Sequence, residues 1–356
     1  MKSWIASSAG LMVVLAGVAR SEGQSPSVFN MPNGQTSLQF VTVGDPGNAG
    51  DTQVMVTDGT TGYGSVPYTY QMGTYDVTLS QYTAFLNAVA QTDTYGLYNS
   101  HMGTDFPYYF SVNIGITQSG SSGTYSYSVM GNGNVPVFDV TWGDAARFCN
   151  WLQNGQLTVA QGGLAITETG AYTLSGATSD EALMLVNRNA GAKYFIPSEN
   201  EWYKAAYFDP TLNGGAGGYW TYATRSNSVP SNGFSTTGTN NANYGLSDQT
   251  NYLTPVGYFA GSPGPYGTFD QGGDVFQWNE ANISGSRRGL RGGACYDDSG
   301  YLRSSSRLGS TPTYEGTVVG FRVASTPEPA SITLLLAASL GVVGVLFHRR
   351  RRGVKR

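Results

Sequence analysis

Residues 290–307 read LRGGACYDDSGYLRSSSR, with a double glycine, one cysteine and two adjacent carboxylates. The pattern predicts short strand-like segments at Leu290–Ala294 and Tyr301–Arg307. Asp297 and Asp298, which lie between them, are interpreted as a solvated turn. An acid–base pair is disfavoured, because adjacent residues on a strand point to opposite faces.

Three amphipathic helices are predicted upstream of this stretch. They follow Thr78, Thr141 and Ser198, and apolar residues recur at helical spacing after each of these positions. Asp144 and Glu201 stand three residues after Thr141 and Ser198, which is the spacing of a capping box. The helix starts are therefore marked by side chains that can satisfy the first free amides.

The rest of the body alternates short strands with long polar stretches. Phe40–Thr74 predicts short strands interrupted by Gly and Asp, and Gly320–Ala324 predicts a last one. Gln118–Asn134 and Asn213–Thr250 are rich in Gly, Ser, Thr and Asn and are predicted to be loops. Loops of this length in a compact domain are usually functional or held by ligands.

Composition indicates an acidic protein rich in loops. Charged residues are 12% of the 356, against a usual ~25%, and there are 49 Gly and 24 Tyr. Eight of the 19 Lys and Arg lie in the two terminal segments, against one of the 23 Asp and Glu. The body between them carries 11 cations and 22 anions, which disfavours nucleic-acid binding. Two cysteines exclude a disulfide framework.

The N-terminus has the layout of a secretory signal peptide over residues 1–21. Lys2 precedes an apolar run, Ile5–Val18, and small residues follow at Ala19 and Ser21. The alternative is a buried first helix, which is disfavoured because polar sequence begins at once after the run. We therefore expect an exported protein.

The C-terminal segment, residues 326–356, has the layout of a membrane anchor. Residues 330–347 carry no charge, a span slightly under the ~20 residues that cross a bilayer, and six Lys and Arg follow. Such cations stay on the cytoplasmic side, so the body lies outside. With Pro327-Glu328-Pro329 ahead of the helix, the segment resembles a PEP-CTERM sorting signal. The resemblance implies a sorting protease as partner. The protein would stay membrane-anchored at the cell envelope, or be released to the extracellular matrix after sorting.

Seven segments of the body form an ordered set. They are YQMGTYDVTLSQYTAFLNAV (70–89), PVFDVTWGDAARFCNWL (136–152), YFIPSENEWYKAAY (194–207), TPVGYF (254–259), YGTFDQGGDVFQWNE (266–280), LRGGACYDDSGYLRSSSR (290–307) and GFRVA (320–324). Together they resemble the formylglycine-generating enzyme, or sulfatase-modifying factor, family. The resemblance implies one α+β domain over residues 22–325, with its core at about 70–324. Its fold would be C-type-lectin-related, with little regular secondary structure.

The family's oxidases bind copper through two cysteines in the segment after Arg-Gly-Gly, and soft thiolates suit Cu(I). Aligned on Arg291, Cys295 falls where the family has an aromatic residue, and the positions of the pair hold no cysteine. Cys149 lies on the apolar face of a predicted helix, where cysteine is usually a small hydrophobe. Copper and catalytic residues are therefore not expected.

A second branch of the family consists of non-haem iron enzymes, whose histidine ligands come from an additional helical domain. The body holds only one histidine, His101. A site with two or three histidines is therefore excluded.

Structural calcium is the metal that the resemblance implies, held by hard oxygen ligands. The first implied site consists of the side chains of Asn243 and Asp248 and the carbonyls of Tyr244 and Thr250. The second consists of Asp270, the carbonyls of Gly273 and Val275, and Gln277. The family has Glu where this chain has Gln277, so we expect the second site to be weaker or empty. The alternative at both sites is that these residues only cap turns.

We expect a non-catalytic ligand-binding or structural module. Loops at Asp297–Gly300, Ser310–Thr317 and Tyr108–Phe110 could line a concave site, with Asp297, Asp298 and Arg303 as ligand-binding residues. Aromatic rings with short polar side chains suit a glycan or a peptide. The alternative is an oxidoreductase of this family with altered site chemistry.

Overall fold

A computed structural model describes residues 27–29, 37–104, 113–247, 250 and 252–327. The elements, in chain order, are β1 (Ser27–Phe29), β2 (Leu38–Val43), β3 (Tyr70–Gly73), α1 (Leu79–Val89), η2 (Ser100–Gly103), β4 (Gly115–Ser119), β5 (Ser126–Met130), α2 (Trp142–Gln153), α3 (Val159–Gly162), α4 (Ala165–Glu168), α5 (Asp180–Met184), β6 (Tyr194–Phe195), α6 (Glu199–Tyr207), β7 (Phe208–Asp209), α7 (Leu212–Gly215), β8 (Gly218–Tyr219), β9 (Phe276–Ile283), β10 (Arg287–Arg291), β11 (Leu308–Ser310), β12 (Val319–Gly320) and β13 (Ala324–Ser325). The predicted signal peptide and nearly all of the predicted anchor lie outside the described residues. Within the described ranges, no helix has the length and apolar character needed to cross a membrane.

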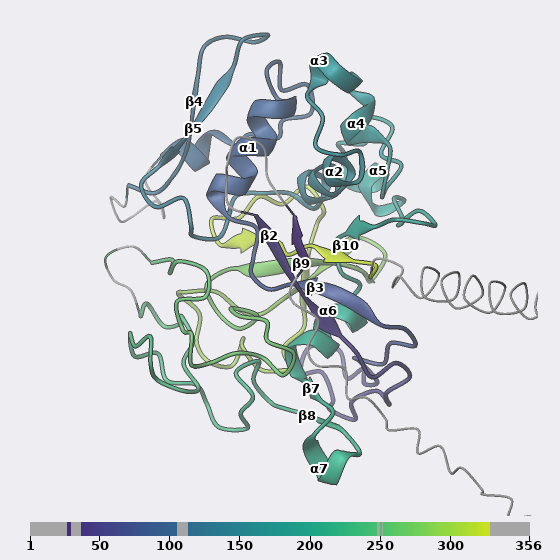
Figure 1. Ribbon diagram of the computed structural model, residues 1–356, viewed down its shortest axis with the longest axis vertical. Helices are drawn as coiled ribbons and strands as arrows, with labels where there is room; N and C mark the ends of the chain where they lie inside the picture. The colour runs from purple at the N-terminus through teal and green to yellow at the C-terminus, as the bar shows by residue number, and fades with distance from the viewer. Residues whose placement is uncertain (1–26, 30–36, 105–112, 248–249, 251, 328–356) are drawn as a thin grey trace, which may run out of the picture.

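Two sheets form the middle of the molecule (Figure 1). One has five strands in the order β1-β2-β3-β13-β6, all antiparallel. The other has the order β11-β10-β9-β12, with β12 parallel to β9. In the first sheet the two residues of β13 pair with both β3 and β6. The last strand of the domain thus lies between an early strand and one from the middle of the chain.

The three predicted helices are confirmed as α1, α2 and α6. Each begins with a reciprocal capping box, in which the cap hydroxyl accepts the N3 amide and the N3 side chain accepts the cap amide. The caps are Thr78, Thr141 and Ser198. Figure 1 shows α1 and α2 on one side of the sheets and α6 on the other.

An aromatic cluster joins α1 and α2 to the C-terminal strands. Phe148 of α2 meets Phe85 of α1 at 5.4 Å and Phe321 at 5.3 Å between ring centroids, both edge-to-face. All three rings are fully buried. Such pairs contribute about 0.5–1.5 kcal/mol each beyond the area that they bury. Cys149 is buried in the same core, as its place on the apolar face of α2 predicts.

Several strand and loop predictions were wrong. The predicted loop Gln118–Asn134 contains most of the β4–β5 hairpin, whose Ser, Thr and Gly residues gave no clear alternation of apolar positions. Tyr301–Arg307 forms turns, because this segment wraps over the Arg-Gly-Gly turn instead of pairing along its length. The strand predicted at Leu290–Ala294 is shifted toward the N-terminus, to β10.

Candidate functional site

The Arg-Gly-Gly turn is shaped by close packing on the segment that follows it. Gly292 and Gly293 have φ angles of 108° and 75°, a region that favours glycine. A Cβ atom on Gly293 would lie 2.8 Å from the side chain of Leu302. The turn therefore brings residues 294–303 back over the end of β10.

Asp297 and Asp298 both cap turns, as predicted, but only Asp298 is exposed, whereas Asp297 is half-buried. The carboxylate of Asp297 accepts the Ala294 amide at 2.9 Å, and that of Asp298 accepts the Gly300 amide at 2.7 Å. Burial raises the pKa of Asp297 to about 6. Arg303 is exposed, and its Nε donates to the hydroxyl of Tyr222 at 3.0 Å.

Three exposed tyrosines lie on the loops around these residues. Tyr296, Tyr301 and Tyr314 are 47%, 39% and 46% exposed, and we call them the tyrosine surface. Tyr296 interacts with Tyr314 and hydrogen-bonds Thr317, which places the loop after β10 beside the loop after β11. Of the three loops predicted to line a concave site, these two are adjacent, and Tyr108–Phe110 lies outside the described residues.

The cysteines do not form a copper centre of the family's kind. Cys149 and Cys295 are both buried and not disulfide-bonded. Burial raises the pKa of both thiols, and the charged neighbours of Cys149 (Glu280, Arg188) differ from those of Cys295 (Asp274, Asp297). The residues present therefore do not fit Cu(I). In the described part of the chain, no three His, Cys, Asp or Glu side chains are grouped to hold a metal.

The first implied calcium site is only partly described, because Asp248 lies outside the described residues. The Asn243 Nδ2 group donates to the Tyr252 carbonyl at 2.8 Å and to Asp274 at 2.7 Å. The Asn243 Oδ1 atom is buried and has no hydrogen-bond partner among the residues that the structure describes. The carbonyl of Tyr244 accepts the Ser247 hydroxyl at 2.7 Å.

The second implied site is brought together but filled by protein donors. The Gln277 Oε1 atom accepts the Trp202 indole at 2.7 Å and Arg322 Nε at 3.2 Å, and Gln277 Nε2 donates to the Asp270 carbonyl. The carboxylate of Asp270 accepts the Gly257 amide at 2.6 Å. Gln277 stands where the family has Glu, and its side-chain oxygen thus already accepts two hydrogen bonds. The Gly273 amide, next to these residues, donates to the Gly292 carbonyl at 2.9 Å.

Asp274 links the two implied sites and was missed from the sequence. It is buried and accepts hydrogen bonds from Thr254 and Asn243. Burial and the neighbouring Asp270 raise its pKa to about 7. The sequence feature that could have indicated a buried carboxylate is its position between Gly273 and Val275, in the most apolar part of the segment.

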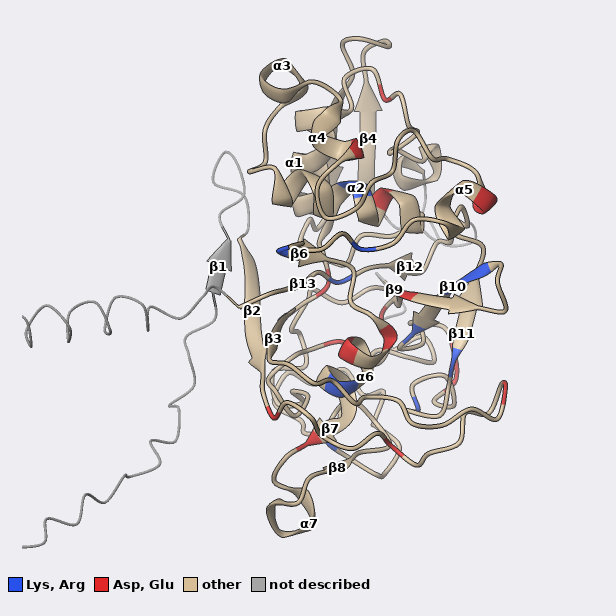
Figure 2. Ribbon diagram, turned by 90° about the vertical axis from the view of Figure 1, so that its right-hand side faces the viewer, with Lys and Arg blue, Asp and Glu red and all other residues tan. Residues whose placement is uncertain are grey.

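Six of the nine arginines in the described body form ion pairs. Arg291 and Arg307 both pair with Glu199, and Arg188 pairs with Glu201 and Glu280. In Figure 2, acidic residues are coloured on α6 and near β9, and basic residues on the neighbouring segments. The arginines near the Arg-Gly-Gly turn therefore hold α6 against the second sheet.

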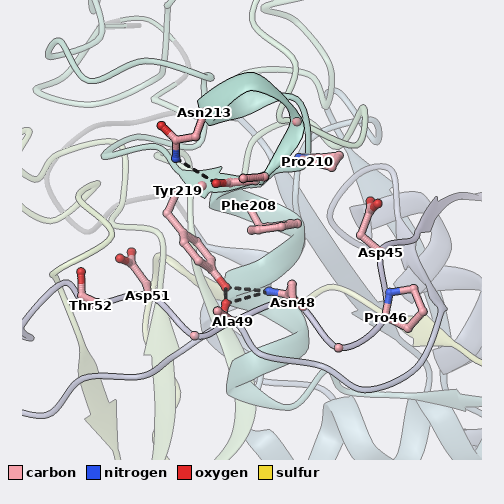
Figure 3. Close-up of a pocket in the computed structure, with 16 residues that line it drawn as sticks. Asp45, Pro46, Asn48, Ala49, Asp51, Thr52, Phe208, Pro210, Asn213 and Tyr219 are labelled. Atoms are coloured by element: carbon pink, nitrogen blue, oxygen red, sulfur yellow. Dashed lines mark hydrogen bonds between the residues drawn. The ribbon is translucent and has the colours of Figure 1, made fainter.

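A cleft of about 550 Å³ is lined by none of the individual site residues predicted from sequence, although one of its walls includes the start of the predicted loop Asn213–Thr250. One wall is formed by residues 45–52 and the other by the segment from Phe208 to Tyr219 (Figure 3). Asn48 Nδ2 donates to the Gly64 carbonyl at 2.8 Å and to the Tyr219 hydroxyl at 2.7 Å. The Tyr219 hydroxyl donates in turn to the Ala49 carbonyl at 2.7 Å. These bonds tie the two walls together across about 170 residues of sequence.

The two sheets, the three capped helices and the Arg-Gly-Gly turn define an α+β domain with little regular secondary structure. The family model of the sulfatase-modifying factor enzyme 1-like domain matches residues 42–327. The chain therefore belongs to this family, and the resemblance inferred from the seven segments is confirmed.

Solved structures resemble this chain at low sequence identity. Treponema denticola variable protein 1 is 20% identical with a TM-score of 0.50, and the match covers 85% of this chain and 99% of that one. CarF is 20% identical with a TM-score of 0.49, covering 82% and 99%. PvdO from Pseudomonas aeruginosa is 18% identical with a TM-score of 0.47, covering 85% and 100%. A search of curated proteins finds no match.

Proposed function

We propose that the chain is an exported, membrane-sorted protein whose domain binds a ligand and does not catalyse copper-dependent oxidation. The observation that best supports the lack of copper chemistry is the burial and the spacing of the two cysteines. Both are buried with raised pKa, and neither follows the Arg-Gly-Gly turn at the spacing of the family's copper pair. A Cu(I) site needs thiolates that can reach one ion together.

The tyrosine surface is the proposed binding surface. Its three rings are exposed, as are Asp298 and Arg303, and the half-buried Asp297 accepts the Ala294 amide in the turn that carries Tyr296. Tyrosine presents a rigid ring and a hydroxyl at small entropic cost, which suits a glycan or a peptide. We assign Asp297 a positioning role and give the ligand contacts to the tyrosines, Asp298 and Arg303.

Export and anchoring are proposed from the two terminal segments alone. A signal peptide at 1–21 and a sorting signal at 326–356 would place the acidic body outside the membrane, attached or released by a sorting protease. Fractionation of cells that express the full chain tests this proposal. Recovery of the body in the cytosol contradicts it.

Calcium is proposed at the first site only. The buried Asn243 Oδ1 atom has no partner among the described residues, which supports an oxygen ligand there, since buried polar atoms are rarely left unsatisfied. The occupied Gln277 oxygen argues against an ion at the second site. A calcium-dependent rise in Tm that is lost in Asn243→Leu supports the proposal. Equal Tm with calcium and with chelator overturns it.

The catalytic question is tested on the purified full chain by elemental analysis and an oxygen-consumption assay with a cysteine-containing peptide. We expect no stoichiometric copper and no turnover. Thiol titration should find both cysteines protected in the native protein and both reactive after denaturation, because burial shields them. Stoichiometric copper with turnover would establish the alternative, an oxidoreductase with altered site chemistry.

A further inference from the structure

The cleft between residues 45–52 and 208–219 is a second concave surface, independent of the tyrosine surface. Its volume of about 550 Å³ is within the range of small-ligand sites, roughly 300–1,000 Å³. It shares no lining residue with the tyrosine surface. Its ligand can therefore be argued from its own walls.

Aromatic rings form one part of the lining. Phe208 and Tyr219 pack with their centroids 5.1 Å apart, and Figure 3 shows both rings between the Asn213 loop and Asn48–Ala49. The Tyr219 hydroxyl is held by Asn48 and Ala49. The ring orientation is thus fixed before any ligand arrives, which lowers the entropic cost of binding.

The charges of the lining exclude an anionic ligand. Asp45 and Asp51 are its only charged residues, and no Lys or Arg is present among the sixteen that line it. The ammonium of Lys204 donates to the Asp45 carbonyl at 2.8 Å, but this side chain is fully buried and does not line the cleft. A phosphate or carboxylate would therefore meet only like charge.

The same two carboxylates do not converge on a cation. Asp45 and Asp51 lie at opposite ends of the lining in Figure 3. Each already accepts a tyrosine hydroxyl, from Tyr266 at 3.0 Å and from Tyr203 at 2.7 Å. An ionised carboxylate has about four acceptor sites, so each keeps some for hydroxyl donors of a ligand. Two separated acceptors suit a ligand with several hydroxyls better than one with a single point charge.

Glycine residues leave the backbone accessible in the wall formed by the segment from Phe208 to Tyr219. A Cβ atom at Gly217 would lie 2.6 Å from the Phe208 ring, and its φ is 82°. Gly215 and Gly218 also line the cleft, so peptide groups are exposed to a ligand without side chains in front of them. This wall offers donors and acceptors next to aromatic rings.

We propose that this cleft binds an uncharged carbohydrate. The apolar face of a sugar ring would pack on the half-buried Tyr219, whose ring is supported from behind by the buried Phe208, and its hydroxyls would donate to Asp45, Asp51 and backbone carbonyls. The combination of an aromatic ring, separated acceptors and bare peptide groups matches a molecule that is apolar on its ring faces and rich in donors around its edge.

Isothermal titration calorimetry of the full chain with maltotriose, cellotriose and chitotriose tests the proposal. At least one of these neutral probes should bind saturably. Ala216→Trp, which fills the cleft from an exposed lining position, should weaken that binding at least about tenfold. Leu185→Trp is the matched control, because it adds the same side chain at a position that is 79% exposed and remote from the lining.

Asp45→Asn tests the acceptor role with a smaller change. Its amide can still accept the Tyr266 hydroxyl, and we expect binding to weaken by about two- to tenfold. Tyr314→Ala, in the tyrosine surface, distinguishes the two proposed binding surfaces. Loss of neutral-probe binding in Tyr314→Ala but not in Ala216→Trp would place the sugar on the tyrosine surface and overturn this inference.

Two further outcomes overturn the proposal. One is no saturable binding of any neutral trisaccharide up to about 10 mM. The other is binding of trilysine, but not of the sugars, that Ala216→Trp removes. That result would make the cleft a cation site. Neither outcome bears on the thiol and copper tests of the proposed function.

Discussion

Asp139 places a carboxylate where it is costly to ionise. It is buried, its φ is 53°, and within the described part of the chain its Oδ2 atom has no hydrogen-bond partner. Burial raises its pKa to about 6, although His101 opposes the shift. Because the folded pKa is above the unfolded value, this group favours folding below about pH 4, and that contribution is lost as pH rises through 6.

Asp139→Asn should therefore stabilise the protein at neutral pH. Asn tolerates the positive φ and removes the buried charge, so we expect up to about 3 kcal/mol at about pH 7.5 and little change at about pH 3.5. Urea unfolding at both pH values measures the difference. Asp298→Asn, at an exposed turn, is the control. An equal effect of Asp139→Asn at both pH values contradicts the account.

Arg322 and Asp76 form an ion pair in which both side chains are fully buried. Arg322 also donates to the carbonyls of Gly73 and Phe269, so it joins β3 to the loop before β9. Arg322→Met leaves a buried carboxylate without its partner. We expect a loss of about 3–5 kcal/mol of unfolding free energy.

Arg287→Met is the matched control for Arg322→Met, because Arg287 is exposed on β10. Its effect should stay within about 0.5 kcal/mol. Denaturant unfolding of the two variants compares them directly. Similar stability of both would show that the buried pair does not hold the fold.

Site residues were predictable where they act locally. Asp297 and Asp298 cap turns within three residues of themselves, and the sequence pattern identified the turn. The cleft was not predictable, because Asn48 and Tyr219 meet across 171 positions. The Gly-rich stretch near Asn213 was predicted as a loop, but nothing in the sequence indicates which segment it packs against.

Helix α2 depends on its capping box for a defined start. The hydroxyl of Thr141 accepts the Asp144 amide at 2.9 Å, and the Asp144 carboxylate accepts the Thr141 amide at 2.9 Å. Thr141→Ala should cost about 1 kcal/mol, measured by thermal or urea unfolding. Thr141→Ser keeps the hydroxyl and should recover most of that loss. No recovery in the serine variant would assign the loss to packing of the threonine methyl group.

The elements that the sequence predicted are those with local signals. The helices carry both a cap and a regular apolar spacing, so their starts agree with the structure to the residue. Strands β12 and β13 have two residues each and pair with distant partners. Two residues cannot show an alternating pattern, so their pairing is set by tertiary packing alone.

The five-stranded sheet predicts where the chain can be shortened. A chain that ends at Thr326 keeps β13 between β3 and β6, whereas one that ends at Phe321 leaves these strands unjoined and removes Arg322. We expect cooperative thermal unfolding for the first and its loss for the second. Circular dichroism of both proteins measures this. A cooperative transition in the shorter chain would show that β13 is dispensable.

The central position of β13 also sets the timing of folding. Strands β2 and β3 are synthesised early, but the partner that connects them to β6 is completed only at Ser325. A nascent chain can thus form local helices while its main sheet stays open until nearly the last residue of the domain. For a protein that is threaded through a membrane as we propose, this delay keeps the polypeptide in a translocatable state until the whole domain has been delivered.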